Sequence, residues 1–201
     1  MIRELMPVPL VLASRNPGKL VELRRILGPG FELRALPHDA PEVDETGATF
    51  EENALLKARS AAAATGLAAV ADDSGLAVDA LNGMPGVLSA RWSGAHGDDE
   101  ANLRLVLGQV SGVPDERLGA AFVCAAAVAT PDGSEQVVRG EVRGRLVRER
   151  RGEHGFGYDP IFVPEGESHT TAEMEPAEKD AISHRGRAFR ALADVLPGLI
   201  A

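Results

Sequence analysis

The amino-acid sequence predicts a fold of the α/β class in a single domain, and two observations support this prediction. Apolar runs that favour strands alternate along the chain with segments whose apolar residues recur at helical spacing. The chain of 201 residues is long enough to bury a core, and it contains no internal repeat, low-complexity tract or dividing linker. We therefore expect residues 1–201 to form one domain, with room for two lobes.

The N-terminal half is expected to alternate strands and helices. The clearest helix begins at Thr49, where Thr49 and Glu52 have the spacing of a capping box, and Gly66 supplies its C-terminal stop. In order we expect strand Val8–Ala13, a helix from the Ser14–Gly18 loop to Leu27, strand Phe31–Leu36, acidic loop Pro37–Gly47, helix Thr49–Gly66 and strand Leu67–Ala71.

The C-terminal half is expected to be richer in strands. Two long β-type runs flank Pro131–Gly133, a turn signal that suits a hairpin. In order we expect an acidic turn Asp72–Gly75, strand Leu76–Leu81, an ordered glycine-rich loop Gly83–Gly97, helix Asp98–Val110, strands Ala120–Thr130 and Glu135–Val147, and helix Arg187–Leu196. The arginine-rich stretch Arg143–Arg151 is expected to form a solvated strand edge and loop that discourages edge pairing.

Composition limits the kinds of partner and the cellular compartment that we expect for this protein. The net charge of −9 opposes non-specific binding to polymeric nucleic acid. The single cysteine, Cys124, lies in an apolar run, so we expect a buried, reduced thiol. The segment Met1–Leu12 is too short an apolar stretch for a signal peptide or a membrane span. These features predict a cytoplasmic protein that binds no membrane.

The first candidate site is Ser14-x-Asn16-x-x-Lys19, between a predicted strand and a predicted helix. A hydroxyl, an amide, the free N–H groups of a helix N-terminus and a lysine together form an anion cradle that suits phosphate. The pattern is not a Walker P-loop, because Ala13 and Leu20 occupy positions that need Gly and Ser or Thr. An ordinary turn in which Asn16 caps the helix explains the same residues, so both interpretations stay open.

The second candidate is Asp72-Asp73-Ser74-Gly75, which follows an apolar strand. Adjacent carboxylates on an extended segment point to opposite sides, and two such charges are costly without a cation. Mg²⁺ would relieve that repulsion and bridge to phosphate oxygens, with Glu45 as a further ligand. A solvated turn is the alternative.

Two further candidates lie near the C-terminus. Gly155-Phe156-Gly157-Tyr158-Asp159-Pro160 offers aromatic faces for stacking on a planar ring, although the aromatics could instead fill a core edge. Glu178–Gly186 carries Lys179, His184 and Arg185 as donors for phosphates or base carbonyl groups, or simply as the solvated start of the last helix.

Taken together, these segments closely resemble the inosine triphosphate pyrophosphatase family, whose prokaryotic members are the dITP/XTP pyrophosphatases. The resemblance extends from about Val8 to Leu196 and also includes Glu45-Thr46-Gly47-x-Thr49-Phe50-x-x-Asn53-Ala54-x-x-Lys57-Ala58 and Gly86-x-x-Ser89-Ala90-Arg91. It implies an elongated, two-lobed α/β fold with a central mixed sheet flanked by helices, an active site in the cleft between the lobes, and a homodimer. It also implies hydrolysis of ITP, dITP and XTP to the monophosphate and pyrophosphate, which cleanses the nucleotide pool of deaminated purines.

The resemblance assigns roles to individual positions. Asp73 would accept the proton of the attacking water, and Glu45, Asp72 and Asp73 would bind Mg²⁺, with Asp72 as a supporting ligand or orienting group. The residues implied to bind substrate are Ser14, Arg15, Asn16, Pro17, Gly18, Lys19, Lys57, Ser74, Phe156, Gly157, Tyr158, Asp159, Lys179, His184 and Arg185.

Two other functions are compatible with parts of the sequence. A Maf-like enzyme acting on dTTP or UTP would share the general architecture, but Ser183–Gly186 and Phe156–Asp159 argue against it. A non-catalytic nucleotide sensor would use the same phosphate cradle, but binding alone does not need the acidic pair Asp72 and Asp73.

Overall fold

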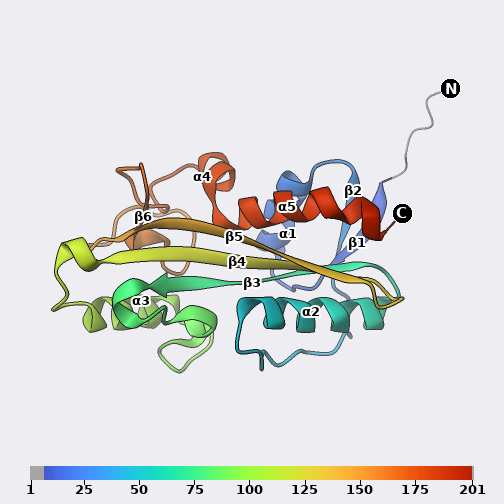
Figure 1. The fold of residues 1–201 in the computed structure, drawn as a ribbon, viewed down its shortest axis with the longest axis horizontal. Coiled ribbons are helices and arrows are strands. Elements are labelled where there is room, and N and C mark those ends of the chain that lie inside the picture. The colour runs from blue at the N-terminus through green and yellow to red at the C-terminus, as the bar shows by residue number, and fades with distance from the viewer. Residues whose placement is uncertain (1–6, 201) are drawn as a thin grey trace. The chain divides into compact units, whose positions relative to one another are not determined.

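The computed structural model describes residues 7–200 and contains a six-stranded sheet with helices on both of its faces (Figure 1). The strand order is β2-β1-β3-β4-β5-β6. Strand β1 pairs in parallel with β2 and β3, whereas β5 and β6 are antiparallel, so the sheet is mixed. The strands are β1 Val8–Leu12, β2 Phe31–Ala35, β3 Ala69–Val78, β4 Gly119–Ala129, β5 Glu135–Leu146 and β6 Phe162–Pro164. The predicted α/β class and mixed sheet are confirmed.

The α-helices of the described residues are α1 Pro17–Leu27, α2 Phe50–Thr65, α3 Asp99–Gln109, α4 Pro176–Ile182 and α5 His184–Leu199. Within residues 7–200, none of them is long and apolar enough to cross a membrane. Residues 1–6, which begin the segment Met1–Leu12 considered above, lie outside the described residues, as does residue 201.

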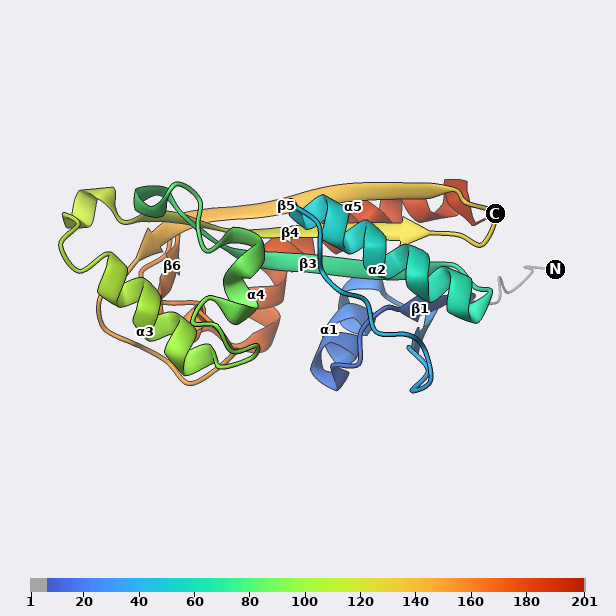
Figure 2. The same cartoon turned by 90° about the horizontal axis from the view of Figure 1, so that it is seen from below.

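The chain divides into two compact units, and strands β3, β4 and β5 contribute residues to both. Unit 1 comprises Met1–Asp73, Ala125–Gly140 and Gly186–Ala201. In this unit α2 covers one face of the strands, while α1 and α5 lie on the other face (Figures 1 and 2). The apolar side chains of β1, β3 and these helices are buried between the layers.

Unit 2 comprises Ser74–Cys124 and Glu141–Arg185. Its core contains an apolar cluster that joins the ends of β3, β4 and β5 to α3 and to the segment that leads into β6. Nearly every residue of β4 is buried, as expected for a strand that is covered on both faces, and Cys124 is fully buried as predicted.

The ends of α1 and α2 follow from their sequences. The Asn16 side chain accepts hydrogen bonds from the N–H groups of Gly18 and Lys19 and so caps α1. Thr49 caps α2 through the Glu52 N–H, as predicted, while the Glu52 carboxylate accepts from the Ala48 N–H (2.7 Å). Gly66 ends α2 in the left-handed conformation.

Strand β3 corrects the predicted turn at Asp72–Gly75. The strand runs without interruption from Ala69 to Val78, and both carboxylates lie inside it. A solvated turn is unnecessary because Lys19 pairs with Asp72 and Lys57 pairs with Asp73. Burial of the two aspartates in a strand is therefore compatible with their charge.

Three other differences concern the C-terminal region. The predicted sheet edge at Arg143–Arg151 is wrong in its first part, because β6 pairs with Gly144–Leu146 of β5. Helix α4 and strand β6 carry too few residues to show a periodic pattern in the sequence. Helix α5 begins at His184 and continues past Pro197 to Leu199, beyond the predicted end at Leu196.

Candidate functional site

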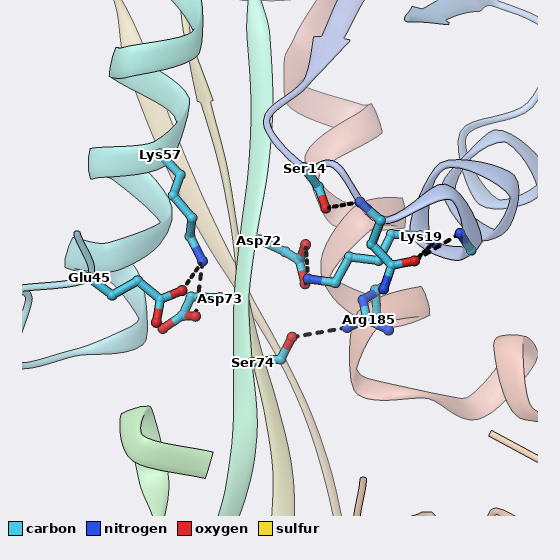
Figure 3. A network of polar contacts seen from close by, with 10 residues as sticks. Ser14, Lys19, Glu45, Lys57, Asp72, Asp73, Ser74 and Arg185 are labelled. Atoms are coloured by element: carbon cyan, nitrogen blue, oxygen red, sulfur yellow. Dashed lines mark hydrogen bonds and ion pairs between the residues drawn. The ribbon is translucent and has the colours of Figure 1, made fainter. Parts of the chain in front are cut away.

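Two carboxylates, Glu45 and the buried Asp73, share one lysine and form the centre of the candidate site in unit 1. Lys57 Nζ, on α2, lies 3.0 Å from Glu45 Oε1 and 3.1 Å from Asp73 Oδ1 (Figure 3). The exposed fractions of the three side chains are 17% for Lys57, 23% for Glu45 and 10% for Asp73. The acidic loop, helix α2 and strand β3 thus bring together three residues that the sequence singled out.

Burial and charge set the protonation of this cluster. Burial raises the pKa of Asp73 above its ordinary value, because it penalises the ionised form; the Lys57 charge acts against this shift, and the Glu45 charge adds to it. Burial alone would lower the pKa of Lys57, but the charges of Asp73, Asp72 and Glu45 outweigh burial and raise it. Lys57 is therefore an ammonium ion, and Asp73 is a stronger base than an exposed aspartate.

Asn53 connects the same two segments through a neutral side chain. Its amide nitrogen donates to Asp73 Oδ2 (3.1 Å), and its amide oxygen accepts from the Gly47 N–H (2.7 Å). The side chain is fully buried. A Cβ at Gly47 would lie only 2.6 Å from the Asn53 oxygen, so the close approach of the acidic loop to α2 requires glycine at this position.

Asp72 points to the opposite face of β3 from Asp73, because side chains alternate along a strand (Figure 3). Both of its oxygens accept from Lys19 Nζ, at 3.0 and 3.1 Å. Asp72 is nearly fully buried, so the Lys19 ammonium is its necessary counter-charge. The structure therefore separates Asp72 from Glu45 and Asp73 and pairs it with the lysine of the predicted phosphate cradle.

The loop before α1 is held by its own hydrogen bonds. Ser14 Oγ accepts from the Asn16 N–H (3.2 Å), and the Asn16 side chain caps α1 as described above. The cap is the one expected of an ordinary turn, and the role of the loop in binding phosphate stays a prediction. Pro17 occupies the first turn of the helix, where it needs no N–H partner. Arg15 donates to Glu42 and to two carbonyl groups of the acidic loop. Arg15 thus joins the loop before α1 to the acidic loop.

A second cluster, in unit 2, surrounds the exposed ring of Phe156. Phe156 is 55% exposed, and both Lys179 Nζ and the Arg185 guanidinium lie over its ring, 5.5 and 5.8 Å from the centroid. Arg185 also donates to Ser74 Oγ (3.2 Å). An exposed aromatic face flanked by two cations can stack on a planar ring and donate hydrogen bonds to its oxygen atoms.

Asp159 is the internal anchor of this second cluster. Its buried carboxylate accepts from the Phe156 N–H (2.9 Å), from Lys179 Nζ (2.5 Å) and from Thr171 Oγ1 (2.8 Å). The next amide, the N–H of Gly157, donates to Asp99 at the start of α3 (2.9 Å). These contacts show Asp159 holding the Phe156 loop in place.

Two predicted substrate-binding residues lie in the core of unit 2. The Tyr158 ring belongs to the apolar cluster, and its hydroxyl donates to the Ser89 carbonyl (2.9 Å). Burial, followed by the Asp99 charge, raises the pKa of this hydroxyl. The His184 ring stacks on Phe122, with centroids 4.9 Å apart and an interplanar angle of 16°. Tyr158 therefore offers no free face, and of the two aromatic residues in this loop only Phe156 is exposed.

The donor set in unit 1 fits a divalent cation such as Mg²⁺ at two carboxylates. Glu45 and Asp73 converge on one cationic group, and Mg²⁺ is commonly held by one or two carboxylates together with substrate phosphates. Within residues 7–200 there is no group of three His, Cys, Asp or Glu side chains that could hold a metal. The expected third ligand, Asp72, is instead held by Lys19 on the other face of β3.

Comparison with known proteins establishes the family. Residues 10–195 match the sequence profile of the Ham1 family. The chain belongs to the Ham1 family. This Ham1-family chain is 60% identical over 198 residues to the dITP/XTP pyrophosphatase of Mycobacteroides abscessus, covering 95% of the chain and 96% of the relative. It is 63% identical over 195 residues to the dITP/XTP pyrophosphatase of Frankia alni, with coverage of 93% and 96%.

Solved structures agree with this assignment. A HAM1 protein from Coxiella burnetii superposes on the Ham1-family chain with a TM-score of 0.87 at 41% identity, covering 95% of this chain and 99% of the other. The nucleoside-triphosphatase / dITP/XTP pyrophosphatase of Mycobacterium abscessus gives a TM-score of 0.77 at 62% identity, with coverage of 92% and 98%. The predicted family is therefore confirmed.

Three residues of this Ham1-family chain hold the two clusters together, each within its own unit, and had no role predicted from the sequence. Asn53 lies in the motif that runs from Glu45 to Ala58, and a polar residue on the buried side of an alanine-rich helix is the signal that could have revealed it. Asp99 and Thr171 gave no such signal, because their partners, Gly157 and Asp159, lie 58 and 12 residues away in the chain.

Proposed function

We propose that this protein hydrolyses non-canonical purine nucleoside triphosphates, namely ITP, dITP and XTP, to the monophosphate and pyrophosphate. The observation that carries the proposal is the partly buried cluster of Glu45, Lys57 and Asp73, which combines a carboxylate base with a pair of oxygen ligands for a divalent cation. Relatives about 60% identical are dITP/XTP pyrophosphatases, which supports the same substrate class for this chain.

In the proposed reaction Asp73 receives a proton from the attacking water. The water oxygen forms a bond to the α-phosphorus, and the bond between that phosphorus and the oxygen bridging to the β-phosphorus breaks. Burial raises the pKa of Asp73, which makes it a better base, and the Asn53 amide holds one of its oxygens. Pyrophosphate leaves as the product, and no covalent intermediate is needed.

The phosphate chain would be bound by lysines and by the loop before α1. Lys57 and Lys19 carry the positive charge, and the Ser14 hydroxyl lies in the loop that follows β1. Mg²⁺ held by Glu45 and Asp73 would supply charge neutralisation for the pyrophosphate leaving group. Asp72 would set the position of the Lys19 ammonium.

The purine would be recognised by the Phe156 cluster. The exposed Phe156 ring supplies a stacking surface, and Lys179 and Arg185 supply donors beside it. Donors directed at a 6-oxo group would be left unpaired by the 6-amino group of adenine, so ITP and XTP would be favoured over ATP. A pocket without an acceptor for the 2-amino group would disfavour GTP in the same way.

The test is a substrate panel in H₂¹⁸O. The purified protein and Mg²⁺ are incubated with ITP, dITP, XTP, GTP, ATP, dTTP and UTP, and the phosphate products are resolved. Monophosphate carrying the ¹⁸O label, together with unlabelled pyrophosphate and fastest from ITP, dITP and XTP, is the expected result. A diphosphate with orthophosphate would contradict attack at the α-phosphorus, preference for dTTP or UTP would indicate a Maf-like activity, and binding of ITP without turnover would indicate a sensor.

Three further properties belong to this proposal. We infer that Mg²⁺ is the working cation, that the protein is a homodimer, and that it acts in the cytoplasm. The hard oxygen donors support the first property, the family resemblance supports the second, and the single buried thiol supports the third. Turnover across a series of divalent cations tests the metal, and light scattering coupled to size exclusion tests the dimer.

A further inference from the structure

Two side chains of α2 connect the acidic loop to Asp73 in different ways. Lys57 connects Glu45 to Asp73 through its positive charge. Asn53, one turn earlier in α2, connects the Gly47 amide to Asp73 through a neutral amide group. Residues four positions apart lie on one face of a helix, so both links reach the acidic loop and β3 from the same side.

The Lys57 ammonium uses the oxygens that a divalent cation would need. It contacts one oxygen of Glu45 and one oxygen of Asp73, at 3.0 and 3.1 Å. An ammonium ion and a divalent cation at the same two carboxylates repel each other at short range, and in a partly buried site solvent screens that repulsion weakly. The two cations therefore compete for the pair.

A second position is available to the Lys57 ammonium group. Its side chain lines a cavity of about 140 Å³ that is also lined by Ser14 and Arg15, next to the loop before α1. The flexible four-carbon stem of lysine allows its charged group to move while the backbone of α2 stays in place. An anion bound beside Ser14 would attract the ammonium in that direction.

The Asn53 link does not compete with a cation, because it carries no charge. It contacts Asp73 Oδ2, whereas Lys57 contacts Asp73 Oδ1, so the two links use different oxygens. On the loop side it binds the Gly47 backbone and leaves the Glu45 carboxylate alone. Displacement of Lys57 would therefore leave the Asn53 connection between the acidic loop and β3 intact.

We propose that Lys57 is the counter-ion of the Glu45–Asp73 pair until a divalent cation binds there, and that its ammonium group then moves to a substrate phosphate. Asn53 is the positioning residue that keeps the two carboxylates aligned during this exchange. This inference rests on the proposed metal-dependent function. It predicts that the Lys57 side chain lowers the affinity of the pair for a metal and that the Asn53 side chain raises it.

The test measures Mn²⁺ binding by electron paramagnetic resonance at pH 8 without nucleotide. Lys57→Gln removes the competing charge and is expected to bind Mn²⁺ about tenfold more tightly or better. Asn53→Leu removes the neutral link and is expected to weaken Mn²⁺ binding about 10- to 100-fold, as for other residues that orient metal ligands. Lys57→Arg keeps the charge and is expected to show no gain in affinity.

Glu51→Gln is the matched control, because Glu51 lies on α2 and pairs with Arg139 away from this cluster. Its Mn²⁺ affinity should equal that of the original protein, and circular dichroism checks the fold of every variant. Should Lys57→Gln not fold, Lys57→Met makes the same charge change.

Three outcomes would overturn the inference. Weaker or unchanged Mn²⁺ binding in the Lys57→Gln protein would show that Lys57 is not a competing counter-ion. Unchanged binding in the Asn53→Leu protein would remove Asn53 from the positioning role. Absence of Mn²⁺ binding in both the original protein and the Lys57→Gln protein would remove the metal pair itself. Opposite shifts in affinity without hydrolysis of any nucleotide would sustain this inference and contradict the proposed function.

Discussion

At the scale of single residues, Asp72 and Asp73 differ in role because they differ in partner. They are adjacent on β3, yet Asp72 is held by Lys19 on one face and Asp73 by Lys57 and Asn53 on the other. Two buried carboxylates can coexist in one strand because each has its own ammonium ion. Asp73 shares the Lys57 ammonium with Glu45, so we expect Asp73 to serve both as the base and as a metal ligand.

Substitution of Asp73 tests this assignment. We expect Asp73→Asn to retain the fold but to lose about 10²-fold or more in kcat for ITP, because it removes a positioned base and a metal ligand together. Steady-state kinetics with a thermal melt separates loss of activity from loss of structure. Turnover close to that of the original protein would exclude Asp73 as the base.

The aromatic residues of the Phe156 loop give a second prediction with a built-in contrast. Phe156→Ala is expected to raise KM for ITP by the equivalent of about 1–3 kcal/mol, since it removes the exposed stacking surface. Tyr158→Phe is expected to leave KM unchanged and to lower stability by about 1 kcal/mol, because the Ser89 carbonyl loses its donor. Kinetics and chemical denaturation on both variants check the pair, and a large KM effect at Tyr158 would reverse the assignment.

At the scale of elements, the pairing of β5 with the three-residue strand β6 depends on one glycine. A Cβ at Gly144 would lie 2.3 Å from the Val163 carbonyl oxygen and 3.0 Å from the Pro164 Cα, which are backbone atoms and cannot rotate away. Close approach of two backbones is the reason for glycine here. Strand β6 precedes the segment that holds Thr171 and α4, so its pairing supports the Phe156 cluster.

Gly144→Ala is therefore expected to lower the free energy of unfolding by about 1–3 kcal/mol, as overpacking of a rigid site does. The matched control is Gly108→Ala, since a Cβ at Gly108 in α3 meets no atom within 4 Å. In that helix alanine should raise stability by about 0.5–1 kcal/mol. Urea denaturation of both proteins measures the contrast, and equal effects would contradict the packing argument.

Elements were predictable where the signal was local. Thr49 and Gly66 marked both ends of α2, and the hairpin turn at Pro131–Gly133 lies between β4 and β5 as expected. The continuity of β3 was not predictable, because the residues that neutralise its two aspartates stand 53 and 16 positions away in the chain. The same applies to the burial of Tyr158, whose hydrogen-bond acceptor is Ser89. Sequence patterns identified the residues of the candidate site but could not show which side chains form hydrogen bonds and ion pairs with one another.

At the scale of the whole molecule, the two units share three strands. Strands β3, β4 and β5 each contribute residues to both units, so each unit contains only part of each of these three strands. Because each of these strands is one continuous element, loss of its structure in one unit is expected to spread into the other. We therefore expect the two units to unfold together.

Two optical probes test this expectation. Trp92 and Tyr158, the one tryptophan and the one tyrosine of the chain, both lie in unit 2, whereas far-ultraviolet circular dichroism reports the helices of both units. Coincident midpoints in urea for Trp92 fluorescence and for circular dichroism are expected of a two-state transition. A circular-dichroism change that is complete only after the fluorescence change would show unit 1 to be independent.

The fully buried Cys124 makes the protein convenient for site-specific labelling. A thiol inside an apolar strand is protected from maleimides, so a cysteine introduced at the surface would react alone without removal of the native residue. Val21 in unit 1 and Leu105 in unit 2 are exposed side chains where such a cysteine could be placed. A doubly labelled protein would then report the distance between these positions with and without nucleotide, on an otherwise native background.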